Sequence, residues 1–228
     1  NFVFTNSSFE NIQGDTNSAA IFITGSSGVI SNNNFSNTAG AVVSYYSKGT
    51  VYNNNAIALS GKGIVTVKNS NEENASDTIR NNNIINSALN GYGIIVDRSS
   101  GSVLVKENTI TNTDNAIVNS GQSDSVTTLF MSNIIDGQNK SGSTGITQTT
   151  GMGIDSSSSV SGVYLNNFIQ NNTTGFKIVC AADMTNSITA NDNFVSGNNT
   201  YVDLTSDGTL NNSFTCNWWG TASSGDVS

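Results

Sequence analysis

The sequence predicts an all-β fold, a right-handed parallel β-helix of about nine coils, from three observations. A motif of an apolar residue, two variable residues, Asn, one variable residue and then Phe or Ile recurs along the chain. Only short apolar clusters, separated by turn residues, lie between successive copies. Pro is absent from all 228 residues, as expected if nearly every strand donates hydrogen bonds to its neighbours. Strands this short can bury a core only by stacking as coils.

The apolar residue that ends each motif is the predicted inward anchor of one coil. Successive anchors lie 20 to 33 residues apart, and equivalent strands of neighbouring coils would pair in parallel about 4.8 Å apart. The nine anchors are Phe9, Phe35, Ile57, Ile84, Ile110, Ile135, Phe168, Phe194 and Phe214. We expect them to form one inward stack, with right-handed crossovers between parallel strands.

A column of Asn residues is predicted two positions before the anchors. Asn suits a bend because it tolerates left-handed backbone angles and its side chain bonds to the main chain. The predicted ladder contains Asn33, Asn55, Asn82, Asn108, Asn133, Asn166 and Asn212. Ser7 and Asp192 hold the same position in the two remaining copies. We expect the Asn side chains to hydrogen-bond from coil to coil.

Length and charge limit the organisation and the partners of the chain. We expect a single β-helix domain over residues 1–222, and a tail or the start of a linker over 223–228. No apolar run reaches the roughly 20 residues of a membrane span. The first residues lack signal-peptide features, so we expect a processed chain or an excised segment. A net charge of −8 disfavours nucleic acid as a partner, and the absence of His removes the commonest acid/base group and metal ligand.

Two local patterns carry a family resemblance. Coils of the form Asn-Asn-X-Ile followed by Gly-Ile-X-Val resemble the repeats of NosD-like and pectate-lyase-like right-handed β-helix proteins. The run Cys216-Asn217-Trp218-Trp219-Gly220 is similar to the Asn-Trp-Trp-Gly motif that closes such repeats in large secreted and surface proteins. The resemblance covers residues 1 to about 222 and implies the fold. It leaves function open, because lyases, hydrolases, adhesins and structural stalks share this fold.

The candidate catalytic residues are the middle residues of the Gly-Ile-X motif in the later coils: Asp155, Lys177 and Asp203. Stacked in register, the two carboxylates would lie about 9 to 10 Å apart, near the upper limit for an inverting glycosidase. The alternative, which we favour, is an alternating-charge ladder that relieves repulsion. Asp97-Arg98 with Arg80 and Asp77 is a second candidate, for which a surface salt bridge is the favoured alternative.

The same column in the earlier coils is apolar and predicts an interface. It contains Phe22, Val43, Val65, Ile95 and Val118. Alternation directs these side chains outward, and a contiguous exposed apolar stripe marks an interaction surface. Two alternatives remain: the insert between Asp136 and Met152 covers the stripe, or a one-residue slip turns it inward.

Modification sites and cofactors are weakly specified. Sequons for N-glycosylation occur at Asn6, Asn34, Asn74, Asn139, Asn171, Asn172, Asn198 and Asn211. Cys180 and Cys216 form either a disulfide or two separate thiols. We expect no cofactor, and calcium at the Asp-containing turns is the minor alternative.

The function that these observations favour is a non-enzymatic extracellular structural or adhesive module. It would belong to a cell-surface layer, stalk or filament, with other copies of itself, adjoining domains or glycans as partners. The alternative is a polysaccharide lyase or hydrolase, or a carbohydrate-binding β-helix. The first is favoured because the acidic residues are dispersed and His is missing.

Overall fold

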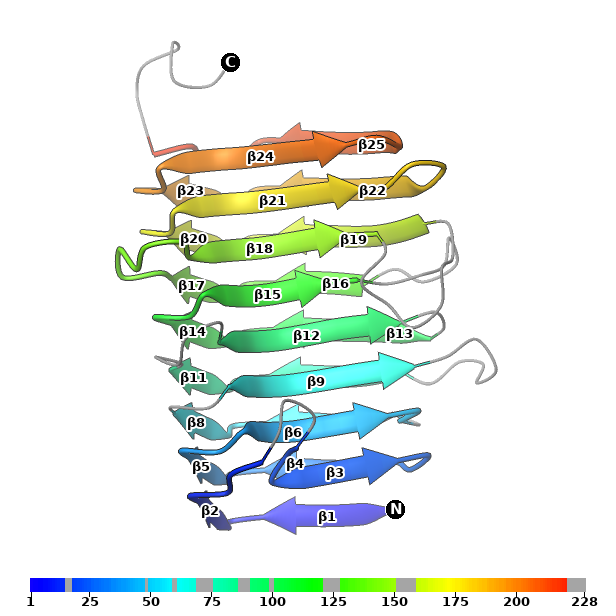
Figure 1. The fold of residues 1–228 in the computed structure, drawn as a ribbon, viewed down its shortest axis with the longest axis vertical. Helices are drawn as coiled ribbons and strands as arrows, with labels where there is room; N and C mark the ends of the chain where they lie inside the picture. Colours follow the sequence, from blue (N-terminus) through cyan, green and yellow to red (C-terminus); the bar gives the residue numbers. More distant parts are fainter. Residues whose placement is uncertain are drawn as a thin grey trace.

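The computed structural model is a solenoid whose described residues form 25 short strands in three parallel sheets (Figure 1). It describes residues 1–14, 18–47, 49–58, 61–68, 76–85, 91–98, 101–120, 128–150 and 159–220. Each complete coil contributes one strand to each sheet, and every strand pairing joins a strand to its equivalent in the next coil, as in β10–β13. This arrangement confirms the predicted parallel β-helix.

Sheet A has nine strands: β1 (Phe2–Thr5), β4 (Gly28–Ser31), β7 (Val51–Asn53), β10 (Ser76–Arg80), β13 (Ser102–Lys106), β16 (Thr128–Met131), β19 (Ser159–Leu165), β22 (Thr185–Asn191) and β25 (Thr209–Thr215). Sheet B has eight: β2 (Ser8–Glu10), β5 (Asn34–Ser36), β8 (Ala56–Ala58), β11 (Asn83–Ile85), β14 (Thr109–Thr111), β17 (Ile134–Asp136), β20 (Phe168–Gln170) and β23 (Phe194–Ser196). Sheet C also has eight: β3 (Ile21–Thr24), β6 (Gly40–Tyr45), β9 (Lys62–Lys68), β12 (Tyr92–Arg98), β15 (Asn115–Asn119), β18 (Thr144–Thr149), β21 (Thr174–Cys180) and β24 (Thr200–Ser206). The predicted count of about nine coils is therefore slightly high, because sheets B and C each contain eight strands among the described residues.

The core is the lumen enclosed by the three sheets. One apolar cluster runs through it from Ile21 to Val195. Alternate residues of each strand point into it, so strands such as β10 and β19 alternate between buried and half-buried residues. At the C-terminal coil, Trp219 packs against this cluster, and its ring lies 6.1 Å from that of Phe214.

The inward column of sheet B confirms six of the predicted anchors and corrects three. Phe9 through Ile135 hold the predicted places in register. In the next two coils Ile169 and Val195 are the buried residues, and Phe168 and Phe194 point outward. Phe214 belongs to β25 of sheet A, where it pairs with Ala190. At Phe168 and Phe194 a one-residue shift in phase moves the side chain to the other face of the sheet, whereas Phe214 still packs against the lumen cluster, but from sheet A.

Part of the lumen between sheets A and C is polar. The Tyr164 hydroxyl donates to Gln148 Oε1 at 2.7 Å, and Gln148 Nε2 donates to Asn186 Oδ1 at 2.6 Å. Asn119 Nδ2 donates to the same Gln148 oxygen at 3.1 Å. Burial raises the pKa of Tyr164, so this hydroxyl remains a donor. These bonds offset the cost of burying the polar side chains, although Asn119 Oδ1 is buried without a hydrogen-bond partner.

Asp77 also lies in the lumen, although the sequence favoured a surface salt bridge for it. Its side chain is fully buried and accepts hydrogen bonds from Thr50 N at 2.7 Å, from Thr66 Oγ1 at 3.3 Å and from the Ser47 hydroxyl. Its position on β10 has the same inward phase as Ile79. The reason is strand alternation, because Asp77 lies two residues before the inward-facing Ile79 and therefore points to the same face.

Candidate functional site

The corner between sheets A and B has the same three-residue construction in every coil. The first residue adopts a left-handed backbone conformation, the second points into the corner, and the third begins the sheet B strand with its side chain outward. The left-handed residues are Asn6, Asn32, Asn54, Asn81, Glu107, Ser132, Asn166, Asp192 and Cys216, with φ between 53° and 57°. Asn reaches this conformation at low cost, which explains much of the Asn excess at this corner.

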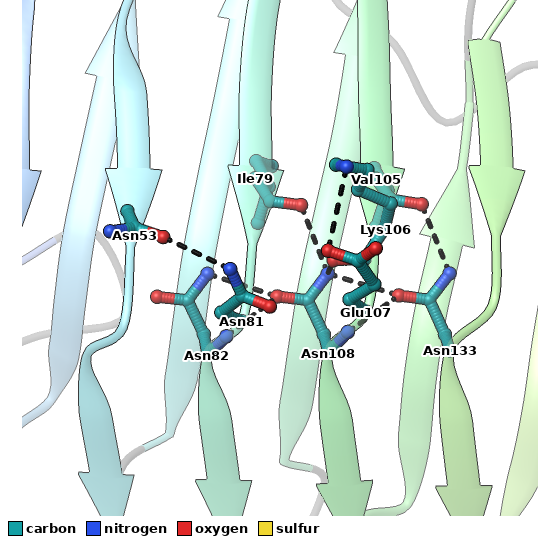
Figure 2. A network of polar contacts seen from close by, with 9 residues as sticks. All are labelled: Asn53, Ile79, Asn81, Asn82, Val105, Lys106, Glu107, Asn108 and Asn133. Atoms are coloured by element: carbon teal, nitrogen blue, oxygen red, sulfur yellow. Dashed lines mark hydrogen bonds and ion pairs between the residues drawn. The ribbon is translucent and has the colours of Figure 1, made fainter.

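The second residue of each corner forms the ladder. Asn108 Nδ2 donates to Asn133 Oδ1 at 3.0 Å, and Asn82 Nδ2 donates to Asn108 Oδ1 at 2.9 Å (Figure 2). The Asn108 amide also donates to the carbonyl oxygen of Ile79 at 3.0 Å. Its oxygen accepts a second bond, from the backbone N–H of Asn82 at 3.0 Å. Each ladder side chain therefore ties its own coil to both neighbours.

The ladder differs from the predicted one in its last three members. Asn33, Asn55, Asn82, Asn108 and Asn133 are confirmed. The remaining members are Asn167, Asn193 and Asn217. Asn166 instead holds the left-handed position, and Asn212 lies in β25, paired with Ile188. Adjacent Asn residues at 166 and 167 made the phase ambiguous, and hydrogen bonding to Asn133 selects the second.

The third residue of each corner forms an outward column on sheet B. In chain order it contains Ser8, Asn34, Ala56, Asn83, Thr109, Ile134, Phe168, Phe194 and Trp218. We call this column the strand rim and the left-handed column the turn rim. The strand rim is polar in the early coils and apolar in the last four.

The apolar end of the strand rim is a continuous stack. The rings of Phe168 and Phe194 lie 5.1 Å apart at 30°, and those of Phe194 and Trp218 lie 4.1 Å apart at 12°. Phe168 is 49% exposed and Trp218 is 48% exposed. Because the rings cover parts of one another's faces, they present a stepped apolar wall to solvent.

The corner between the two rims is shallow and open to solvent. It is hollowed near the N-terminal end, where about 570 Å³ is lined by residues that include Asn6, Asn32 and Asn54. At the opposite end about 310 Å³ is lined by Asp192 and the aromatic stack, among others. The two hollows occupy the same position of the coil, near opposite ends of the solenoid.

The comparison with protein families agrees with this construction. The family model described as "Right handed beta helix region" matches residues 1–135. The chain belongs to this family. The match confirms the predicted right-handed coiling. The repeats of this family are the β-helix coils described above. The comparisons with curated proteins and with solved structures gave no match.

The predicted apolar column faces away from the lumen, as expected, but most of it is not exposed. Phe22, Val43, Val65, Ile95 and Val118 are in register on sheet C. Phe22 is 58% exposed, whereas Val43, Val65 and Val118 are buried. Val43 and Val65 form a cluster separate from the lumen, with Ala19 and Tyr45 packed against it. The predicted exposed stripe is therefore wrong for three of its five residues, and Phe22 alone is largely exposed.

Neither alternative for that column holds within the described residues. Ile64, Ile94 and Ile117 face the lumen, which excludes a one-residue slip. Residues 144–149 of the presumed insert form β18 inside sheet C, so this part of the insert extends the sheet. The sequence analysis did not predict β18, because Thr holds an outward position and Gln an inward position where the repeat has apolar residues.

The predicted acidic cluster is assembled only in part. Lys177 and Asp203 are register neighbours on β21 and β24. In the preceding coil, the register neighbour of Lys177 is Thr147. The predicted place of Asp155 in the column is therefore wrong. Asp155 itself lies outside the described residues. No second carboxylate therefore occupies the register neighbour position on the other side of Lys177.

Asp97 is the one described acid with a strongly raised pKa. Burial raises the pKa of this carboxyl to about 6, and a hydrogen bond with Ser120 opposes the shift. Asp97 pairs with Val67 on sheet C, and Ser120 follows β15 of the next coil. The side chain of Arg98 lies outside the described part of the chain.

Among the residues that the structure describes, no group of three His, Cys, Asp or Glu side chains could hold a metal ion.

The modification sites divide by exposure. Asn172 and Asn198 are buried and bonded to each other, with Asn172 Nδ2 donating to Asn198 Oδ1 at 3.1 Å. Their amides are therefore inaccessible to a glycosyltransferase in the folded chain. Asn6, Asn34, Asn139 and Asn211 are exposed and Asn171 is half-buried, while Asn74 falls outside the described residues.

The disulfide alternative is wrong, because both cysteines are free thiols. Cys180 is buried at the end of β21, and its thiol contacts the carbonyl oxygens of Met184 and Thr209 at 3.3 and 3.4 Å. Cys216 is exposed on the turn rim.

In the described part of the chain no helix is long and apolar enough to cross a membrane.

Proposed function

We propose that this β-helix is a non-enzymatic structural module, a stiff rod that forms part of an extracellular or cell-surface protein. The observation that carries the proposal is the unbroken Asn ladder. It continues from Asn33 to Asn217 and couples each coil to the next through buried side chains. Neighbour-to-neighbour coupling along the whole length is what a load-bearing solenoid requires.

Two further features support the extracellular part of the proposal. Four exposed sequons, at Asn6, Asn34, Asn139 and Asn211, are accessible to glycosylation. The Asn217-Trp218-Trp219-Gly220 run resembles the closing motif of secreted and surface β-helix proteins. In this chain Asn217 ends the ladder and Trp219 packs on the lumen, a geometry suited to closing a coil.

A polysaccharide lyase or hydrolase is the second candidate, and Asp97 favours it. A carboxyl whose pKa is raised by burial is suited to acid/base catalysis. The structural role is preferred because the described residues contain no group of three His, Cys, Asp or Glu side chains that could hold a metal ion, and because Thr147 interrupts the predicted Asp155 column.

Depolymerisation assays separate the two candidates. The purified chain is incubated with a panel of neutral and acidic polysaccharides, with and without added calcium. New reducing ends and unsaturated products are then measured. We expect neither product. Depolymerisation that is lost in Asp97→Asn and retained in the surface control Asp207→Asn would overturn the structural proposal.

A further inference from the structure

The outer face of sheet A carries a continuous apolar column, which we call the apolar strip. One outward residue from each of the nine strands belongs to the column, paired in register from coil to coil, and six of the nine are aliphatic. The aliphatic members are Val3, Val29, Val51, Leu104, Leu129 and Val163. We propose that a second copy of the chain docks on this strip, face to face and with the two solenoids parallel. A single rod already meets the structural role, so this inference goes beyond it, and each can fail without the other.

The strip is accessible, unlike the equivalent column of sheet C. Val43 and Val118 on sheet C are 4% and 2% exposed, whereas no member of the sheet A column is buried. Val3 and Val29 are 68% and 36% exposed. The later members are half-buried because register neighbours flank each of them about 4.8 Å away. A contiguous accessible apolar strip of this kind marks an interaction surface.

Electrostatics favour a second copy as the occupant. The chain has a net charge of −8, so most of its surfaces would repel those of an identical chain. In the strands of sheet A the outward charged residues are Arg80 and Lys106, and the one acid, Asp77, is buried in the lumen. At the edge of this face the Glu107 carboxylate lies 3.4 Å from the Lys106 ammonium. Two copies can therefore approach through sheet A without repulsion between carboxylates.

The two cations also select the parallel alignment. Arg80 and Lys106 are register neighbours two residues after the strip, and Ser76 and Ser102 are register neighbours two residues before it. When identical faces meet with parallel solenoid axes, their strands run in opposite directions. The cations of one copy then lie over the exposed serine hydroxyls of the other, which can accept hydrogen bonds. An antiparallel pair would bring the cations of the two copies together, which is unfavourable.

The size of the face predicts a reversible dimer. Nine strands in steps of about 4.8 Å give a length of about 38 Å, and the strip with the outward residues on either side is about 13 Å wide. Two such faces in contact remove about 1,000 Å² from solvent, the lower limit for a specific interface. We therefore expect monomer and dimer to exchange with protein concentration.

Sedimentation equilibrium of the whole chain, over a series of protein concentrations and under reducing conditions, tests the association. The strip variant is Leu104→Thr with Leu129→Thr, because Thr keeps the strand preference while removing apolar surface. The matched control is Ile85→Thr with Ile134→Thr, two aliphatic residues that are 44% and 47% exposed on sheet B. Thermal melting checks that each variant folds.

Crosslinking tests the alignment. Thr189→Cys places a thiol in the column, and Cys216→Ser removes the exposed native thiol. A short bis-maleimide should join two such chains in a parallel dimer, where the two copies of residue 189 face each other. In an antiparallel dimer centred on Leu104 they would lie about 29 Å apart.

We expect the wild type and the control to dimerise alike and the strip variant to dimerise at least about tenfold more weakly, as for loss of central anchors. A chain that stays monomeric at every concentration, equal dimerisation of strip and control variants, or a dimer that does not crosslink at position 189 would each overturn the inference. So would a monomer that sediments with phosphatidylcholine vesicles through the same two leucines, since the face would then bind lipid. A monomeric rod would still satisfy the proposed structural function, and the depolymerisation assay is unaffected by any of these results.

Discussion

Replacing Asn108 by Ala removes the centre of the ladder while keeping an L residue in an unstrained conformation. The side chain is fully buried. Its loss leaves the backbone N–H of Asn82 without its acceptor at 3.0 Å and removes the amide donor from the Ile79 carbonyl at 3.0 Å. Figure 2 shows that both partners come from the preceding coil. An unsatisfied buried group costs about 1–3 kcal/mol, so we expect a loss of about 2–6 kcal/mol in the free energy of unfolding.

Asn217→Ala is the matched control at the end of the same ladder. Its oxygen accepts from Asn193 N at 2.9 Å, and its amide donates to Ala190 O at 2.7 Å, so the bonds are of the same kind. Asn217 is only half-buried. Water can replace its bonds, and we expect a loss of about 1 kcal/mol, the net value of an ordinary hydrogen bond.

Urea denaturation followed by circular dichroism measures both losses. Hydrogen exchange adds spatial detail, since a broken ladder should raise exchange in the coils that flank Asn108. Equal losses for the two variants, or a loss for Asn108→Ala below about 1 kcal/mol, would refute the reasoning that buried ladder bonds couple the coils.

Three further predictions follow from single sites. For Asp97, the folded carboxyl holds its proton up to about pH 6, whereas the unfolded one ionises near 3.8, so stability falls as pH rises between these values. Asp97→Asn should therefore raise the melting temperature at pH 8 and much less at pH 4, and an equal gain at both would contradict this. Val118→Ser should cost about 2 kcal/mol and Phe22→Ser almost nothing, because Val118 is buried and Phe22 is 58% exposed; chemical denaturation compares them, and the reverse order would contradict the packing. A thiol reagent should label Cys216 rapidly in the folded chain and Cys180 only after denaturation, since only Cys216 is exposed, and rapid labelling of both would contradict the burial of Cys180.

The repeat was predictable from the sequence wherever one Asn and one apolar residue marked the corner without competition. Ile84, Ile110 and Ile135 follow Asn82, Asn108 and Asn133 in this way, and the structure confirms all six. At 166–169 the sequence offers two Asn residues and then Phe168 and Ile169. Hydrophobicity favours Phe168 as the anchor, but the ladder bond to Asn167 fixes the phase and turns Ile169 inward.

The candidate site was less predictable because it depends on phase and not on composition. The aromatic wall exists only because Phe168 and Phe194 point outward, the opposite of the inward anchors that the repeat suggested. The burial of Val43 and Val118 was equally hidden. An alternating pattern specifies which face a side chain takes, and it does not specify what packs on that face.

The ladder also gives the rod an electrical polarity. In the seven side-chain pairs from Asn33 to Asn217, the amide N–H of one coil donates to the amide oxygen of the following coil. The amide dipoles therefore add head to tail, with the positive end toward the last coil, as peptide dipoles add along an α-helix. Aligned hydrogen bonds polarise one another, so the total dipole moment of this buried line grows with the number of coils, and the two ends of the solenoid are electrostatically distinct.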